Sequence, residues 1–193
     1  MSKKMNRRTF IKASVAAGGA AAILPQTIFS SEAKKRVKLG FIGTGLRGQW
    51  MLWLAAKYPD VDIAAICDID NRMIADALKI IKDGGKPEPH IYKNGDEDFL
   101  NMLNNEELDG VYIATPWEWH HPMSVAAMKS GKHVGTEVPA ALTVEDCWDL
   151  VKTSEQSGKL CMIMENVCYR RDVMAVLNMV RQDMFGEILH CQG

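Results

Sequence analysis

A turn with three glycines, GTGLRG at residues 43–48, is the feature that most constrains the fold of this chain. It follows a short run of β-forming residues, 37–42, and leads into an amphipathic segment. A strand that passes through G-x-G-x-x-G into a helix is typical of a dinucleotide-binding βαβ unit. Gly43 permits the tight turn, Gly45 lets the backbone approach a pyrophosphate, and Gly48 lets the helix pack closely on its strand.

An acidic residue after the next predicted strand indicates which dinucleotide fits. That strand covers 61–66, and Asp68 lies about twenty residues after Gly48. A carboxylate at this distance can accept a hydrogen bond from the ribose 2′-hydroxyl, which favours NAD over NADP. Arg47 inside the turn complicates this prediction, because an arginine can also meet a 2′-phosphate.

The rest of the chain alternates apolar strands with helical segments. This pattern predicts a Rossmann-like, doubly wound α/β fold with a parallel sheet that is covered on both faces. Further strands are expected at 90–92, 110–114, 133–135 and 160–164, and helices at 72–81, 98–103, 123–130 and 144–157. A further helix is expected after residues 165–171, and its Met174, Leu177 and Val180 are expected to face a core. Ligands of such sheets bind beyond the carboxyl ends of the strands, so site residues should follow the strands directly.

Three strand ends carry polar and aromatic residues. Residues 115–122, TPWEWHHP, follow one strand, and tryptophan and histidine between prolines would form a rigid wall beside a nicotinamide or sugar ring. The alternative is that the tryptophans are packing residues and that His120 caps the next helix. Glu137 and the segment 165–171 follow two other strands, with solvated surface positions as the alternative for both.

Composition narrows the classes of partner. The chain has 193 residues, 23 Lys+Arg against 24 Asp+Glu and a net charge of −1, so it offers no basic surface for nucleic acid. The length suits one ordinary domain with an appendage. Its five cysteines form no C-x-x-C pair, which indicates neither a zinc site nor a disulfide framework. No metal is therefore expected.

The beginning of the chain is predicted to be an export signal. An arginine pair at 7–8, followed by Phe10 and Lys12, resembles the twin-arginine signal of bacteria, which is an address read by a receptor. The apolar, small-residue run at 13–24 is shorter than a bilayer span requires, so stable membrane insertion is not expected. Cleavage near Ala33 would leave a periplasmic or cell-envelope protein of a bacterium.

Three segments together carry a resemblance to a known family. GTGLRG at 43–48, ATPWEWH at 114–120 and ENVCYRRD at 165–172 resemble the Gfo/Idh/MocA superfamily. Within it, the chain is most similar to glycoside hydrolase family 109, the NAD-dependent alpha-N-acetylgalactosaminidases. The similarity runs from about Val37 to Gly193.

The resemblance implies a division of the chain. After a twin-arginine signal peptide at 1–33, it implies an NAD-binding Rossmann domain at 34–165 and the start of a C-terminal α/β open-sheet domain at 166–193. Most of that second domain is expected to be missing, so the chain is expected to be an N-terminal fragment. Residues 187–192 are expected to begin its first strand.

The resemblance also implies the residues that hold NAD. It places Leu46 and Arg47 at the pyrophosphate, Asp68 at the adenosine ribose and Asn166 close to the reactive ring. The full expected set along the cofactor is Gly43, Gly45, Leu46, Arg47, Gly48, Asp68, Trp117, Glu118, Trp119, His120, Glu137, Val138 and Asn166. His120 and Tyr169 are the candidates for catalytic contact with the sugar.

The implied reaction is a redox-assisted elimination on a small-molecule glycoside. C3 of the sugar is oxidised, the proton at C2 is lost, the glycosidic oxygen leaves, water adds and the ketone is reduced again, with no net oxidation. Sugar dehydrogenases of the superfamily usually carry a lysine where this chain has Val138. Two alternatives stay open, namely a sugar oxidoreductase with net NAD(P) turnover and a nucleotide-binding module without catalysis. A homo-oligomer is compatible with the sequence.

Overall fold

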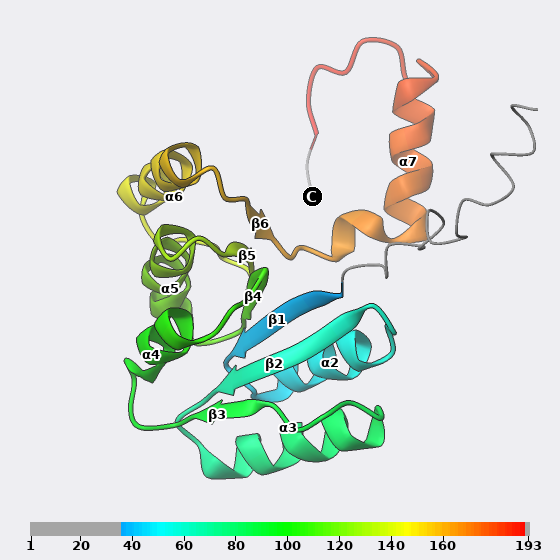
Figure 1. Cartoon of the computed structure of the whole chain (residues 1–193). Helices are drawn as coiled ribbons and strands as arrows, with labels where there is room; N and C mark the ends of the chain where they lie inside the picture. Colours follow the sequence, from blue (N-terminus) through cyan, green and yellow to red (C-terminus); the bar gives the residue numbers. More distant parts are fainter. Residues whose placement is uncertain (1–35, 192–193) are drawn as a thin grey trace, which may run out of the picture. The chain divides into compact units, whose positions relative to one another are not determined.

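Six parallel strands form one sheet in the computed structural model, which describes residues 36–191 (Figure 1). The strands are β1 (Val37–Ile42), β2 (Val61–Cys67), β3 (His90–Tyr92), β4 (Gly110–Ile113), β5 (His133–Thr136) and β6 (Cys161–Ile163). Their order across the sheet is β3-β2-β1-β4-β5-β6. The predicted signal peptide, 1–33, lies outside the described residues.

Helices connect the strands in the expected rhythm. They are α2 (Leu46–Ala56), α3 (Asn71–Asp83), α4 (Asp98–Asn105), α5 (Trp117–Lys129), α6 (Val144–Ser157) and α7 (Arg171–Arg181), with a short 3₁₀ helix, η2, at Val167–Tyr169. Two helix starts have side-chain caps, because Asp70 accepts from the Arg72 amide at 2.8 Å and Thr143 from the Asp146 amide at 3.1 Å. None of the helices in the described part of the chain has the length and apolarity of a membrane span.

The order of the strands creates a switch point in the middle of the sheet. The chain runs outward from β1 to β2 and β3, and then returns to place β4 on the other side of β1. The connections that follow β1 and β4 therefore leave in opposite directions and open a crevice at the carboxyl ends of these two strands. In open α/β sheets, this crevice is where ligands bind.

Two hydrophobic cores fix the sheet between its helices. Figure 1 shows α2 and α3 on one face and α4, α5 and α6 on the other. The first core contains Phe41, Leu52 and Ile66, and the second contains Met102 and Ile113 with residues of α5. All four residues of β4 are buried, as expected for a central strand covered on both faces. The predicted Rossmann-like fold is thus confirmed.

Three expectations about local structure are wrong. Helix α5 begins at Trp117 and contains Pro122, whereas the sequence predicted a rigid connection up to this proline. Tertiary contacts of the first turn outweigh the poor helix propensity of proline. Residues 187–191 form no strand, because no neighbouring strand pairs with them in the described chain.

The third wrong expectation concerns the apolar face of α7. Leu177 is 38% exposed and Val180 is 39% exposed, and the helix has no buried residue. Its main contact within the described residues is the short helix η2. The face that was expected to belong to a core is therefore uncovered in residues 36–191.

Candidate functional site

The glycine turn has two positions that the fold itself requires and one that faces open space. Gly43 has φ +86°, and a Cβ there would lie 2.5 Å from the Ala114 oxygen. A Cβ at Gly48 would lie 2.1 Å from the Gly43 oxygen, so α2 could not approach the turn. A Cβ at Gly45 would meet nothing within 4 Å. The backbone at Gly45 is thus open to a ligand.

The start of α2 is suited to an anion. Gly45 is the N-cap residue of this helix and has no side chain to satisfy its first amides. Free amides at a helix N-terminus, together with the helix dipole, stabilise a pyrophosphate. Leu46, the first residue of the helix, is 88% exposed.

Asp68 ties the glycine turn to the end of β2. Its Oδ2 accepts from the Thr44 amide at 2.6 Å and from the Thr44 hydroxyl at 3.0 Å. Its Oδ1 accepts from the Asp70 amide at 2.9 Å. Since a carboxylate has about four acceptor positions, roughly one remains for a ribose hydroxyl. The same residue therefore organises the turn and lines a cavity at the end of the sheet.

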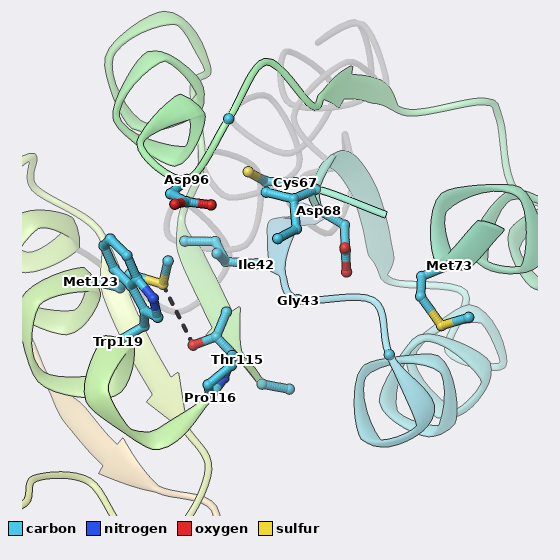
Figure 2. Close-up of a pocket in the computed structure, with 14 residues that line it drawn as sticks. Ile42, Gly43, Cys67, Asp68, Met73, Asp96, Thr115, Pro116, Trp119 and Met123 are labelled. Atoms are coloured by element: carbon cyan, nitrogen blue, oxygen red, sulfur yellow. Dashed lines mark hydrogen bonds between the residues drawn. The ribbon is translucent and has the colours of Figure 1, made fainter. Parts of the chain in front are cut away.

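A cavity of about 290 Å³ lies between the ends of β1, β2 and β4. Figure 2 shows Asp68, Asp96 and Trp119 among the side chains around it. Trp119 also packs edge-on against Phe99, with ring centroids 6.2 Å apart. The residues that line the cavity are Ile42, Gly43, Gly45, Cys67, Asp68, Ile69, Met73, Gly95, Asp96, Ala114, Thr115, Pro116, Trp119 and Met123. A mostly apolar cleft with a few carboxylates suits the adenosine half of a dinucleotide.

Several residues of this cavity were not predicted from the sequence. Ile69 and Asp96 follow β2 and β3 closely, so the rule that ligands bind beyond strand ends could have found them. Met73 and Met123 reach the cavity from inside helices α3 and α5. No sequence signal marks these two methionines.

A second cluster lies beside the turn, at the carboxyl end of β5. Arg47 Nε donates to Glu137 Oε1 at 2.6 Å, and Arg47 Nη2 donates to Asn166 Oδ1 at 3.3 Å. The hydroxyl of Tyr112 also donates to Glu137 Oε1. The fold thus brings together three residues that were predicted separately, Arg47, Glu137 and Asn166. Tyr112 is a fourth member of the cluster, and the sequence analysis did not predict it.

The protonation states of this cluster follow from its contacts. The hydrogen bond with Glu137 raises the pKa of Arg47. Burial raises the pKa of Tyr112, and the neighbouring Glu137 raises it further. Arg47 therefore stays positively charged at neutral pH, and Tyr112 stays protonated and donates.

His120 lies inside the protein, and is only 1% exposed. Its Nδ1 is 2.7 Å from the Pro139 oxygen and its Nε2 is 2.9 Å from the Thr115 oxygen. The ring thus connects the loops that follow β4 and β5. Both nitrogens are occupied by main-chain carbonyls, which suits a positioning role better than contact with a sugar.

The other predicted site residues lie at the surface. Trp117 is 61% exposed, Val138 is 41% exposed and Tyr169 is 66% exposed, and Glu118 is exposed as well. No side-chain hydrogen bond of Tyr169 occurs within the described residues, and none joins it to His120. Residues 36–191 contain no group of three or more histidine, cysteine or acidic side chains that could hold a metal ion.

These features together define a dinucleotide-binding Rossmann domain. They are a parallel sheet with a glycine turn at its switch point, a helix start suited to an anion and a carboxylate at the end of β2. The model of the Gfo/Idh/MocA family, described as "Oxidoreductase family, NAD-binding Rossmann fold", matches residues 37–165. The chain belongs to this family, and its cofactor is NAD, as predicted.

Two shorter matches flank the Rossmann domain. Residues 169–193 match the C-terminal domain of glycosyl hydrolase 109, and residues 4–25 match the twin-arginine translocation signal. These matches to family models confirm the predicted resemblance to glycoside hydrolase family 109 and the predicted twin-arginine signal.

Individual relatives agree with the family assignment. A glycosyl hydrolase family 109 protein of Parabacteroides distasonis is 51% identical over 200 residues, covering 95% of this chain and 43% of the relative. An alpha-N-acetylgalactosaminidase of Tannerella forsythia is 48% identical, with 95% and 43% covered. The chain thus spans less than half the length of these relatives.

A solved structure shares the fold. It is scyllo-inositol dehydrogenase from Lactobacillus casei with bound NAD(H) and scyllo-inositol, at 24% identity and a TM-score of 0.69. The match covers 80% of this chain and 43% of that structure. At this level of identity, the comparison concerns the fold alone.

Proposed function

We propose that the protein carrying this chain is an NAD-dependent glycosidase that releases terminal α-N-acetylgalactosamine by transient oxidation at C3. The similarity to a relative with that name supports the substrate class. The chain supplies the cofactor-binding half of the site. We propose residues 34–165 as the Rossmann domain and 166–193 as the start of the second domain.

Val138 is the observation that favours this function over a net dehydrogenase. It follows Glu137 at the end of β5, is 41% exposed and is joined to Pro139 by a cis peptide bond. A valine cannot exchange a proton with a sugar hydroxyl, so the lysine that net sugar dehydrogenases of the superfamily usually carry here is absent, and the proton that leaves the C3 hydroxyl during the transient oxidation has to be taken by a residue other than Val138.

The partners of Asp68 and Glu137 within residues 36–191 also fit a redox route better than direct hydrolysis by a pair of carboxyl groups. Ordinary glycosidases place two carboxyl groups on either side of the scissile bond. In the described residues, two carboxylates at the sheet edge have structural partners, because Asp68 accepts from the turn and Glu137 accepts from Arg47 and Tyr112. Reversible redox chemistry removes the need for such a pair.

The residues present fit the pyrophosphate and the adenosine ribose of NAD. The open backbone at Gly45 and the free amides of α2 would bind the pyrophosphate, and Asp68 would accept from the adenosine ribose. When bound, NAD supplies reversible hydride transfer, which acidifies the proton at C2 of the sugar.

The chain's own residues would then orient the reacting groups. Arg47, Glu137 and Asn166 would line the nicotinamide half, and buried His120 would hold the loops after β4 and β5 in place. Exposed Tyr169 is the residue of this chain that we place closest to the sugar.

Two experiments test the proposal on the protein expressed from the complete gene. The first follows release of p-nitrophenol from the α-N-acetylgalactosaminide with and without NAD+. Hydrolysis that needs NAD+ without net growth of absorbance at 340 nm supports the proposal, and hydrolysis that is undiminished after removal of the cofactor contradicts it. Steady growth at 340 nm with a free sugar would instead identify a net oxidoreductase.

The second experiment runs the reaction in D₂O. An elimination that passes through C2 exchanges this proton with solvent, so the released sugar should carry deuterium at C2. Retention of the original hydrogen at C2 would indicate direct hydrolysis. Binding of NAD+ without turnover of any glycoside would leave only a binding module.

A further inference from the structure

We infer that Tyr112 is a positioning residue of the cofactor site, which together with Arg47 fixes one oxygen of Glu137 so that the other oxygen faces the nicotinamide half of NAD. The inference deepens the proposed function and rests on its assignment of Glu137 to that half of the cofactor. It adds a residue of β4 that no sequence motif indicated.

The argument begins with the two oxygens of Glu137, which are not equivalent. Oε1 accepts from Arg47 Nε at 2.6 Å and from the Tyr112 hydroxyl. Oε2 has no hydrogen-bond partner within residues 36–191. Because both donors converge on one oxygen, the rotation of the carboxylate is fixed, and the direction in which Oε2 accepts is fixed with it.

Glu137 is also nearly enclosed, with only 8% of the residue exposed. An ionised carboxylate in such a place is costly unless its charge is paired and hydrogen-bonded. Arg47 supplies the opposite charge, and Tyr112 supplies a second donor. The remaining acceptor capacity is therefore available to a donor brought by a ligand, such as a ribose hydroxyl or a carboxamide.

Tyr112 is held rigidly in the position from which its hydroxyl donates to Glu137. It is 5% exposed, and its ring packs against Phe41 with centroids 5.6 Å apart. In the sheet it lies opposite Gly135, two residues before Glu137, and a Cβ at Gly135 would lie 3.7 Å from Tyr112 Cδ2, in ordinary contact with the ring. The hydroxyl is thus aimed by β4, while Glu137 is presented by the neighbouring strand.

The location links this cluster to the cofactor. Ala114, two residues after Tyr112, contacts the glycine turn, since its oxygen would lie 2.5 Å from a Cβ at Gly43. Arg47 belongs to the same turn and first helical residues. A dinucleotide that lies across the turn from the cavity near Asp68 would extend toward the ends of β4 and β5, where Glu137 lies.

The test separates the two halves of NAD. ADP carries the adenosine and the pyrophosphate but lacks the nicotinamide riboside. Calorimetric titration with NAD+ and with ADP should show that Tyr112→Phe weakens NAD+ binding about tenfold, the usual size of one charge-assisted hydrogen bond, and changes ADP binding less than about twofold. A merely structural role would lower both affinities together.

Tyr92 provides a matched control. Its hydroxyl donates to Glu106 Oε1 at 2.7 Å, so Tyr92→Phe removes the same kind of bond in the edge strand β3. We expect this variant to bind NAD+ and ADP as the unchanged chain does. A similar loss of NAD+ affinity in both variants would overturn the inference.

A double variant shows whether Tyr112 acts through Glu137. Glu137→Gln should by itself give the selective loss of NAD+ affinity, and adding Tyr112→Phe should weaken binding little further. The inference is contradicted if the losses of NAD+ affinity in the two single variants multiply in the double variant. It is also contradicted if Glu137→Gln weakens NAD+ and ADP binding equally. These measurements need no glycoside turnover. If the selective loss of NAD+ affinity is observed but the protein has no glycosidase activity, only the proposed function is refuted.

Discussion

Arg47 and Glu137 are 90 positions apart in the sequence, and an ion pair of 2.6 Å joins Arg47 Nε to Glu137 Oε1. The pair connects the first turn of α2 with the end of β5, across the switch point of the sheet. It therefore holds together the two sides of the crevice in which the dinucleotide is expected to lie. Asn166, after β6, extends the connection through Arg47 Nη2.

Replacement of this arginine should show that its geometry matters as well as its charge. Lysine cannot reproduce a planar fork that reaches Glu137 through one nitrogen and Asn166 through another. Arg47→Lys should lower the free energy of unfolding by about 1 kcal/mol in urea denaturation. Arg170→Lys is the control, because Arg170 pairs with Asp172 in solvent and should have no measurable effect. Equal effects of the two substitutions would contradict the prediction.

The glycines of the turn should separate into two classes. Gly48→Ala forces a clash with the Gly43 oxygen and should destabilise the protein strongly, by about 3 kcal/mol or more. Gly45→Ala meets no atom within 4 Å and should cost less than about 1 kcal/mol in stability. It should nevertheless weaken NAD+ binding at least about tenfold by blocking the pyrophosphate. Melting curves recorded with and without NAD+ measure both effects, and unchanged affinity in Gly45→Ala would disprove the assignment.

Asp68 should determine the preference between NAD+ and NADP+. Asp68→Asn keeps the size of the side chain but removes the charge that repels a 2′-phosphate, so the ratio of NADP+ to NAD+ affinity should rise about tenfold. Asp62→Asn, in the same strand β2, removes the charge that pairs with Arg36 and should leave the ratio unchanged. Calorimetric titration with both dinucleotides gives the ratio, and a constant value would show that selectivity arises elsewhere.

Asp98, beside the loop that lines the cavity, should make the stability of the protein sensitive to acid. Hydrogen bonds from the Asn101 side chain and the Asn94 amide lower the pKa of Asp98 below its usual value of 3.8. Since the folded pKa is lower than the unfolded one, the stabilisation is present above about pH 4 and is lost as the pH falls through the folded pKa. Asp98→Asn should therefore cost about 1 kcal/mol at pH 7 and less at pH 2.5.

Urea denaturation at the two pH values tests this prediction. Asp96→Asn is the control, because Asp96 is exposed at the rim of the cavity, and it should have the same stability as the unchanged chain at both pH values. A loss of stability in Asp98→Asn that does not depend on pH would contradict the prediction.

Export should depend on the arginine pair near the start of the chain. We propose a periplasmic or cell-envelope location, and the match of residues 4–25 to the twin-arginine signal supports export. Replacing Arg7 and Arg8 by lysine should leave the protein in the cytoplasmic fraction, because the receptor reads the pair. Fractionation and immunoblotting measure the distribution, and unimpaired export would point to another route.

Much of the fold could be predicted from the sequence because it depends on local patterns. The glycine turn, the strand before it and the acidic residue after β2 follow from spacing along a single βαβ unit. The rule that ligands bind beyond strand ends also identified Glu137 and the segment around Asn166. These signals need only short-range periodicity and the right-handed connection of parallel strands.

The sequence by itself determined the class of fold and the cofactor, and it predicted the strand ends at which the candidate site lies. Only the tertiary structure decided that Trp117 begins a helix, that His120 is enclosed between two carbonyls and that Tyr112 donates to Glu137. The physical reason is that such contacts depend on the order and register of the strands. Tyr112 and Glu137 meet because β4 and β5 are neighbours in register, and nothing in the residues around Tyr112 encodes that partner.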